Sequence, residues 1–94
     1  MSKEEFDEEI IDERSYVINF SKPIYGRGIP RTRRTPRAVR YLRKFIERHM
    51  KVEKVVIDPL VSEVMWQRGI QHPPRKIRIR AVKTDEETVE VFLV

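Results

Sequence analysis

The sequence contains no cysteine among its 94 residues, which excludes disulfides and thiolate metal sites. No apolar run approaches the ~18–20 residues that are needed to span a bilayer. The acidic first stretch, MSKEEFDEEIIDE, lacks the apolar segment of a secretory signal. We therefore expect a cytoplasmic protein without a membrane partner.

Groups suited to catalysis or metal binding are also scarce. The two histidines, His49 and His72, lie about twenty residues apart with no carboxylate at ligand spacing, so they are weak evidence for a metal site. Carboxylates gather toward the two ends of the chain, where we expect them to be solvated rather than held beside a partner in a cleft. We predict no enzymatic activity, no catalytic residue, no metal, no cofactor and no small-molecule substrate.

Glycine is rare, and two of the three glycines lie close together in Tyr25-Gly26-Arg27-Gly28. The third glycine of the dinucleotide fingerprint is missing, and no G-K-S/T of a phosphate-binding loop is present. Glycine permits tight turns and a close approach of the backbone to another group. We predict that these glycines shape a turn close to a binding partner rather than a nucleotide site.

Acidic residues are absent from Tyr25 to Phe45, YGRGIPRTRRTPRAVRYLRKF, which contains seven arginines and one lysine. Residues 15–54 hold twelve basic and two acidic side chains, and residues 68–83 hold six basic and none acidic. Residues 1–14 hold seven acidic and two basic side chains. Segregated charge of this kind indicates a polyanionic partner for the basic segments. The alternative is a merely solvated surface.

A chain of this length makes one small domain with a modest core. Residues 1–12 are predicted to be a mobile acidic leader, because they are highly charged and have little to bury. Residues 13–94 are predicted to form a single domain. Alternation over residues 14–20 predicts a strand with Tyr16, Ile18 and Phe20 on one apolar face. Frequent proline and glycine over residues 21–34 predict an irregular basic loop that becomes ordered on binding.

A helix is predicted to begin at Thr35-Pro36, with Thr35 as its N-cap and Pro36 at its first position. It should end near Met50. At ~100° per residue, one face is apolar and the opposite face is almost purely cationic. The apolar face holds Ala38, Val39, Leu42, Phe45, Ile46, His49 and Met50, with His49 at its edge, and the cationic face holds Arg37, Arg40, Lys44, Arg48 and Lys51.

The rest of the chain alternates further strands and one helix. A strand is predicted at residues 52–57, and Asp58-Pro59 should cap a helix over residues 59–68 that ends at Gly69. Leu60 and Val64 are expected to face inward, with Val61 and Met65 as further candidates. Strands at residues 75–83 and 88–94 should form a hairpin. The predicted fold is α+β, in the order β-α-β-α-β-β, with two helices packed on one face of a small mixed four-stranded sheet.

The basic segments favour folded RNA as the partner. Guanidinium groups bind phosphate oxygens bidentately and stack on bases. A broken loop followed by a rigid helix suits the grooves and bulges of RNA, and a helix face of Arg and Lys suits backbone contacts more than base reading. The predicted RNA-binding residues are Lys22, Tyr25, Arg27, Arg31, Arg33, Arg34, Arg37, Arg40, Arg43, Lys44, Arg48, Arg68, Arg75, Arg78 and Arg80.

The second basic segment allows other interpretations. Either this segment extends the phosphate-binding surface or it forms a solvated strand face, and the pattern does not separate the two. The residues concerned are Arg68, Arg75, Lys76, Arg78 and Arg80. Trp66 is expected to be a core or hairpin-packing residue rather than a platform for a base.

Several separated motifs resemble one family. They are I-x-G-x-G at Ile24–Gly28, P-R-A at Pro36–Ala38, R-K-F at Arg43–Phe45, I-D-x-x-(L/V) from Ile57, W-x-x-G-I at Trp66–Ile70 and R-I-R at Arg78–Arg80. From about Arg14 onward, the chain is similar to a large-subunit ribosomal protein family of archaea and eukaryotes, the eukaryote-type protein numbered thirty-one. It departs from the longer eukaryotic pattern in its short final hairpin and its acidic leader.

The resemblance implies a small α+β domain that binds large-subunit rRNA, without enzymatic activity. It implies a place near the exit of the nascent-chain tunnel, beside other ribosomal proteins and factors that dock there. It assigns RNA contact to Arg27, Arg31, Arg33, Arg34, Arg37, Arg40, Arg43 and Lys44, and less directly to Arg78 and Arg80. The lack of cysteine and the high Arg, Lys and Glu content suit an archaeal, heat-adapted member. The alternative is a free-standing protein–protein adaptor with a basic binding face.

Overall fold

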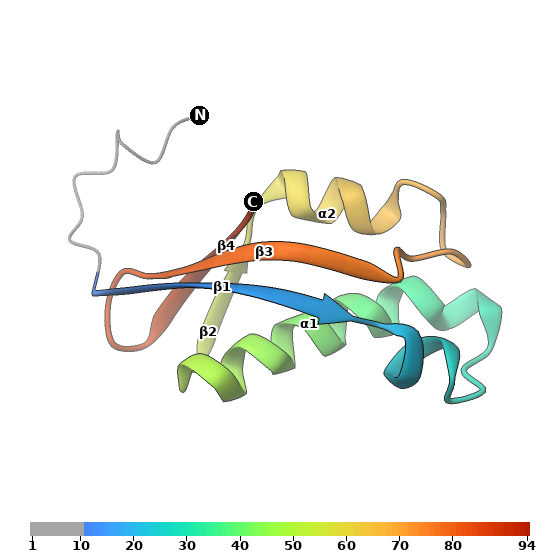
Figure 1. Ribbon diagram of the computed structural model, residues 1–94, viewed down its shortest axis with the longest axis horizontal. Helices are drawn as coiled ribbons and strands as arrows, with labels where there is room; N and C mark the ends of the chain where they lie inside the picture. The colour runs from blue at the N-terminus through green and yellow to red at the C-terminus, as the bar shows by residue number, and fades with distance from the viewer. Residues whose placement is uncertain (1–10) are drawn as a thin grey trace.

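The computed structural model describes residues 11–94, which form a mixed four-stranded sheet with two α-helices over one face (Figure 1). The elements are β1 (Asp12–Asn19), a π-helical turn (Ser21–Tyr25), a 3-10 turn (Arg31–Arg33), α1 (Arg34–Met50), β2 (Lys54–Ile57), α2 (Pro59–Trp66), β3 (Lys76–Lys83) and β4 (Thr88–Leu93). This confirms the predicted α+β fold and its element order. Residues 1–10 of the predicted leader lie outside the described residues, and Asp12 already belongs to β1.

The sheet has the strand order β1-β3-β4-β2, which the sequence did not indicate. β3 pairs antiparallel with both β1 and β4, whereas β2 pairs parallel with β4. The alternation predicted for β3 is confirmed, since Ile77, Ile79 and Ala81 are buried while Lys76 and Arg78 are exposed. β3 therefore separates an apolar face under the helices from a basic outer face.

The hairpin between β3 and β4 is closed by Asp85. Its carboxylate accepts a hydrogen bond from the backbone N–H of Glu87 at 2.8 Å, and this bond lowers the pKa of Asp85. A carboxylate with a lowered pKa stabilises the fold above its ordinary pKa, and that contribution is lost as the pH falls through the lowered value. The contribution of Asp85 to the stability of the turn is therefore lost only at acidic pH.

The core lies between the helices and the sheet. Ala38, Leu42, Ile46 and Met50 are buried along α1, as the helical periodicity predicts. His49 is exposed, although its ring stacks on Phe45 with the centroids 3.9 Å apart. The helix thus buries one narrow stripe and leaves the opposite side to solvent.

The inward face predicted for α2 is partly wrong. Val61 and Met65 are fully buried, whereas Leu60 is 57% exposed. Val64 is half-buried. A two-turn helix buries only one stripe, and its rotation is set by how it docks on the sheet rather than by its own few apolar residues. The predicted cap is confirmed, because the Asp58 carboxylate accepts a hydrogen bond from the backbone N–H of Leu60 at 3.1 Å.

Thr35 is not the N-cap of α1, so that prediction is wrong. The helix begins one residue earlier, at Arg34, and Thr35 is fully buried in its first turn. The Thr35 hydroxyl donates a hydrogen bond to the carbonyl of Gly69 at 2.8 Å, and its backbone N–H donates to the carbonyl of Ile70 at 3.0 Å. The helix tolerates Pro36 because N–H groups in the first turn have no partner within the helix. Thr35 therefore ties the start of α1 to the segment that follows α2.

Replacing Thr35 by valine should lower the free energy of unfolding by about 1 kcal/mol, because the hydrogen bond from the buried hydroxyl to the part-buried Gly69 carbonyl is lost. Urea denaturation measures this change. Thr35→Ser retains the hydroxyl and serves as the control, which should lose less stability. Equal stability of the valine variant and the wild type would contradict the assigned role.

The segment over residues 21–34 contains two short helical turns, where the sequence predicted no regular structure. The carbonyl of the fully buried Phe20 accepts hydrogen bonds from the backbone N–H groups of Ile24 at 3.0 Å and Tyr25 at 3.2 Å. The N–H of Gly26 donates to the carbonyl of Ser21 at 2.7 Å. The backbone thus satisfies its own polar groups despite the prolines. The ordering of this loop by a partner stays a prediction.

Candidate nucleic-acid interface

The outward face of α1 carries a row of cations at the spacing of helical turns. Arg37, Arg40, Lys44 and Arg48 are all exposed. Within residues 11–94, none of them makes a hydrogen bond or an ion pair through its side chain. Their charges are therefore not neutralised by the described part of the protein and are available to an anionic partner.

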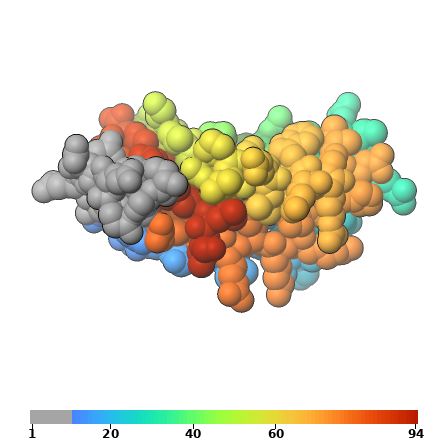
Figure 2. All heavy atoms as spheres, turned by 90° about the horizontal axis from the view of Figure 1, so that it is seen from above, coloured from blue at the N-terminus to red at the C-terminus, as the bar shows by residue number. Residues whose placement is uncertain are grey.

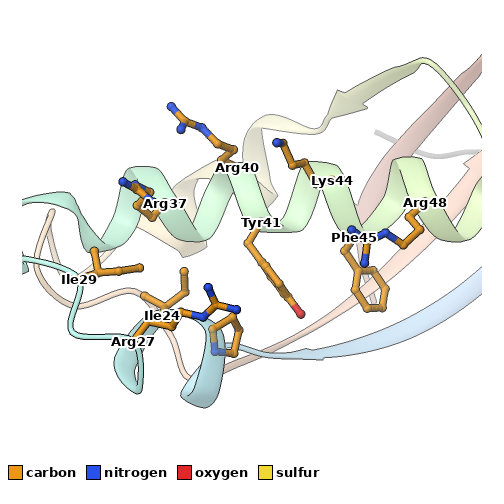
Figure 3. A pocket seen from close by; sticks show the side chains of 10 residues that line it. Ile24, Arg27, Ile29, Arg37, Arg40, Tyr41, Lys44, Phe45 and Arg48 are labelled. Carbon is orange, nitrogen blue, oxygen red and sulfur yellow. The ribbon is translucent and has the colours of Figure 1, made fainter.

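A groove of about 460 Å³ lies between this face of α1 and the preceding loop (Figure 3). Its cationic rim consists of Arg27, Arg37, Arg40, Lys44 and Arg48. Its apolar floor is formed by Pro23, Ile24, Ile29, Tyr41 and Phe45. The groove joins the two halves of the acid-free segment, since the loop and the helix each supply one wall.

A second hollow, of about 640 Å³, is lined by Tyr25 and is richer in polar groups than the groove. The guanidinium carbons of Arg34 and Arg75 lie 4.9 Å and 4.1 Å from the centroid of the Tyr25 ring. The Tyr25 hydroxyl donates a hydrogen bond to the carbonyl of Pro73 at 2.5 Å. Arg68 and His72 complete the basic side of this hollow. Tyr25 therefore connects the loop to residues 68–75, which lie far away in the sequence.

The glycines in this loop serve the chain itself. A Cβ atom on Gly26 would lie 3.1 Å from the carbonyl oxygen of Lys22, so a larger residue would crowd the turn. Gly28 has a φ of +70°, in the left-handed region that favours glycine. The close approach at Gly26 is made to the backbone of its own loop, and the predicted approach of this turn to a partner stays a prediction.

Replacing Tyr25 by phenylalanine should lower the free energy of unfolding by about 1 kcal/mol, because the bond to the Pro73 carbonyl is lost while the ring between the two arginines remains. Thermal or urea denaturation tests this. Tyr16→Phe is the matched control and should cost less, because the Tyr16 hydroxyl meets the sulfur of Met50 at 3.4 Å and the exposed Arg14 side chain rather than a backbone carbonyl. A larger loss in the control would contradict the role given to Tyr25.

The structure divides the predicted RNA-binding residues into groups. Lys22, Arg31 and Arg33 are exposed on the loop beside the groove. Arg43 is exposed, but its guanidinium donates a hydrogen bond to the carbonyl of Val55 at 2.6 Å, so it also holds α1 to β2. None of these four residues lines the groove or the hollow.

Arg78 and Arg80 are separated from the other predicted residues. They belong to the outer face of β3, and side chains of this segment, orange in Figure 2, project on the side of the molecule opposite to α1, shown in green. The Arg80 Nε lies 3.5 Å from a carboxylate oxygen of Glu13, so part of its charge is already paired. The predicted RNA-binding residues therefore do not all lie on one surface of the protein.

The sequence did not indicate the floor of the groove. Tyr41 and Phe45 lie one helical turn apart at the border between the apolar and cationic faces of α1, and that spacing is the only signal that pointed to them. Ile24 and Ile29 reach the groove only through the fold of the loop. Trp66 is 41% exposed, which contradicts a position in the core, while packing against the hairpin, the other role expected for it, stays a prediction.

Other kinds of site find no support in the described chain. No cluster of three or more His, Asp or Glu side chains in residues 11–94 could hold a metal ion. None of the helices described here is long and apolar enough to cross a membrane. The groove and the hollow are therefore the features that remain to be explained.

Comparison with known proteins matches residues 11–90 to the family described as Ribosomal protein L31e. The chain is 51% identical, over 85 residues, to the large ribosomal subunit protein eL31 of Methanopyrus kandleri, covering 90% of this chain and 95% of that protein. It is 42% identical over 81 residues to the eL31 protein of Methanothermobacter thermautotrophicus, covering 86% and 96%. The eL31 protein of Hyperthermus butylicus is 44% identical over 86 residues, covering 87% of this chain and 82% of that protein. The matched span includes every residue of the groove and the hollow.

Proposed function

Because this chain belongs to the ribosomal protein L31e family, we propose that it binds large-subunit ribosomal RNA through the groove, the basic loop and the cationic face of α1. It is a structural constituent of the large ribosomal subunit in the cytoplasm, like the archaeal eL31 proteins to which it is similar. Its family consists of ribosomal structural proteins rather than enzymes.

The row of unpaired cations on α1 carries this proposal. Four exposed positive charges within one helix face repel one another, and no carboxylate in residues 11–94 forms an ion pair with them. A polyanion relieves that repulsion, and arginine binds phosphate oxygens with two parallel hydrogen bonds. Contact with RNA phosphates would thus replace the repulsion among these cations by attraction to the phosphate charges.

The outer sheet face supports contacts of a different kind. It carries Arg78 beside the exposed Val17, and Arg80 is already paired with Glu13. Mixed charge and apolar surface suit neighbouring ribosomal proteins better than an RNA backbone. A location near the tunnel exit, and contacts with factors that dock there, are proposed on the family resemblance alone.

Nuclease footprinting of large-subunit rRNA, with and without the 94-residue chain, tests the RNA assignment. We expect a protected region that disappears when the groove cations are reversed. Co-sedimentation tests the alternative of a free-standing adaptor. A ribosomal protein stays with the large subunit through a moderate-salt wash, and recovery mainly in the soluble fraction would contradict the proposal.

A further inference from the structure

From the groove between the loop and α1, we infer that the protein captures an unpaired nucleotide of the RNA, with its base on the apolar floor and its phosphates on the cationic rim. This inference rests on the proposed function and adds a ligand class to it. Bulges and loops of folded RNA present such nucleotides, and proteins commonly stack their bases on aromatic side chains.

The chemistry of the floor carries the inference. Neutralising a duplex backbone requires only cations, and the rim supplies five. The side chains of Ile24 and Ile29 and the rings of Tyr41 and Phe45 lie beneath these cations. Their apolar surface contributes nothing to the binding of a phosphate. A base has an apolar, stackable face, so a nucleotide matches both parts of the groove at once.

Tyr41 is the residue best placed to meet the base. Its ring is half-buried and packs against the rings of Phe20 and Phe45, with centroid distances of 5.9 Å and 6.4 Å. One face of Phe45 is already covered by His49. The Tyr41 side chain reaches from α1 toward the loop (Figure 3), and its hydroxyl has no hydrogen-bond partner within residues 11–94. It can therefore stack on a base or bond to one of its edges.

Contacts within the protein hold the walls of the groove in place. Ile24 is buried, and its backbone N–H is bonded to the Phe20 carbonyl. The Tyr25 hydroxyl holds the same loop to Pro73. A volume of about 460 Å³ lies within the range of small-ligand sites. Because the walls are fixed by the fold, little ordering cost opposes the entry of a nucleotide.

The experiment compares two RNA duplexes that differ in one nucleotide. One carries a single bulged 2-aminopurine, and the other has 2-aminopurine paired at the same place. Fluorescence anisotropy gives the affinity of the 94-residue chain for each, and 2-aminopurine emission reports stacking. We expect the bulged RNA to bind about tenfold more tightly, with quenched emission.

Matched variants distinguish the contribution of the apolar floor to RNA affinity from that of the cationic rim. Tyr41→Leu keeps an apolar side chain but removes the ring, so it should abolish the preference for the bulge by weakening the bulged RNA about tenfold more than the duplex. Tyr41→Phe should retain the preference. Arg48→Gln removes one rim cation and should weaken both RNAs by the same factor.

The possible failures are distinguishable. Equal binding of both duplexes without quenching would overturn the inference and leave RNA binding intact. Binding of neither RNA above an unrelated control protein would overturn the proposed function as well. If a glutamate-rich peptide displaced RNA at a lower concentration than unlabelled RNA does, the groove would be a protein site and the inference would be wrong.

Discussion

Substituting Arg37, Arg40 and Lys44 together by glutamate should weaken binding to large-subunit rRNA by about 100-fold or more near 0.1 M salt. The three side chains are exposed on one face of α1 and have no partner within residues 11–94. Reversal removes three phosphate contacts and adds repulsion. The slope of log affinity against log salt should also fall by about 2–3. Filter binding over a salt series measures both effects.

The control for this variant must change the net charge by the same amount elsewhere. Arg14, Lys54 and Lys83 lie outside the groove, the hollow and the cationic face of α1, so their joint substitution by glutamate serves this purpose. We expect a loss of only a few fold and an unchanged salt slope. Circular dichroism should show native helix content in both variants. An equal loss in the control would mean that net charge alone, rather than the placed cations, governs binding.

Replacing Phe20 by alanine should lower the free energy of unfolding by about 3–5 kcal/mol. The ring is fully buried at the end of β1 and packs edge-on against Tyr41. Removing it leaves a cavity beneath the groove. Because small domains are stabilised by only about 5–15 kcal/mol, this one change should remove much of the total. Urea denaturation gives the value.

Val17→Ala is the matched control on the same strand. Its side chain is 58% exposed on the outer face of the sheet, so truncation should cost well under 1 kcal/mol. The Phe20 variant should in addition bind RNA less tightly than the Val17 variant, even where both are folded, because the floor of the groove loses its support. Similar stability of the two variants would contradict the core position of Phe20.

The elements of the fold could be predicted because local patterns determine them. Alternation in β3 and the 3.6-residue period of α1 each identify a buried face, and Asp58-Pro59 identifies a helix start. Thr35 shows the limit of such rules. Threonine favours the N-cap position of a helix. In this fold, however, the Thr35 hydroxyl donates its hydrogen bond to the carbonyl of Gly69, which is far away in the sequence. A capping rule considers only neighbours along the chain.

The candidate site could be predicted only in part. The acid-free segment and its helical spacing identified the rim, because charge and period are visible in the sequence. The floor required the loop to fold back beside α1, which places Ile24 and Ile29 opposite Tyr41. Arg78 and Arg80 looked like part of the same surface, yet the position of β3 puts them on the other side of the sheet.

By itself, the sequence of this protein determined a small α+β domain with two basic segments and one cationic helix face. These properties follow from composition and from periods of two and 3.6 residues, which local sterics impose on any chain. Only the tertiary structure decided the strand order, the contact of Tyr25 with Arg34, Arg75 and Pro73, and the union of an apolar floor with a cationic rim. Those features depend on contacts between distant segments, which form when the apolar faces of the helices and the sheet are buried together.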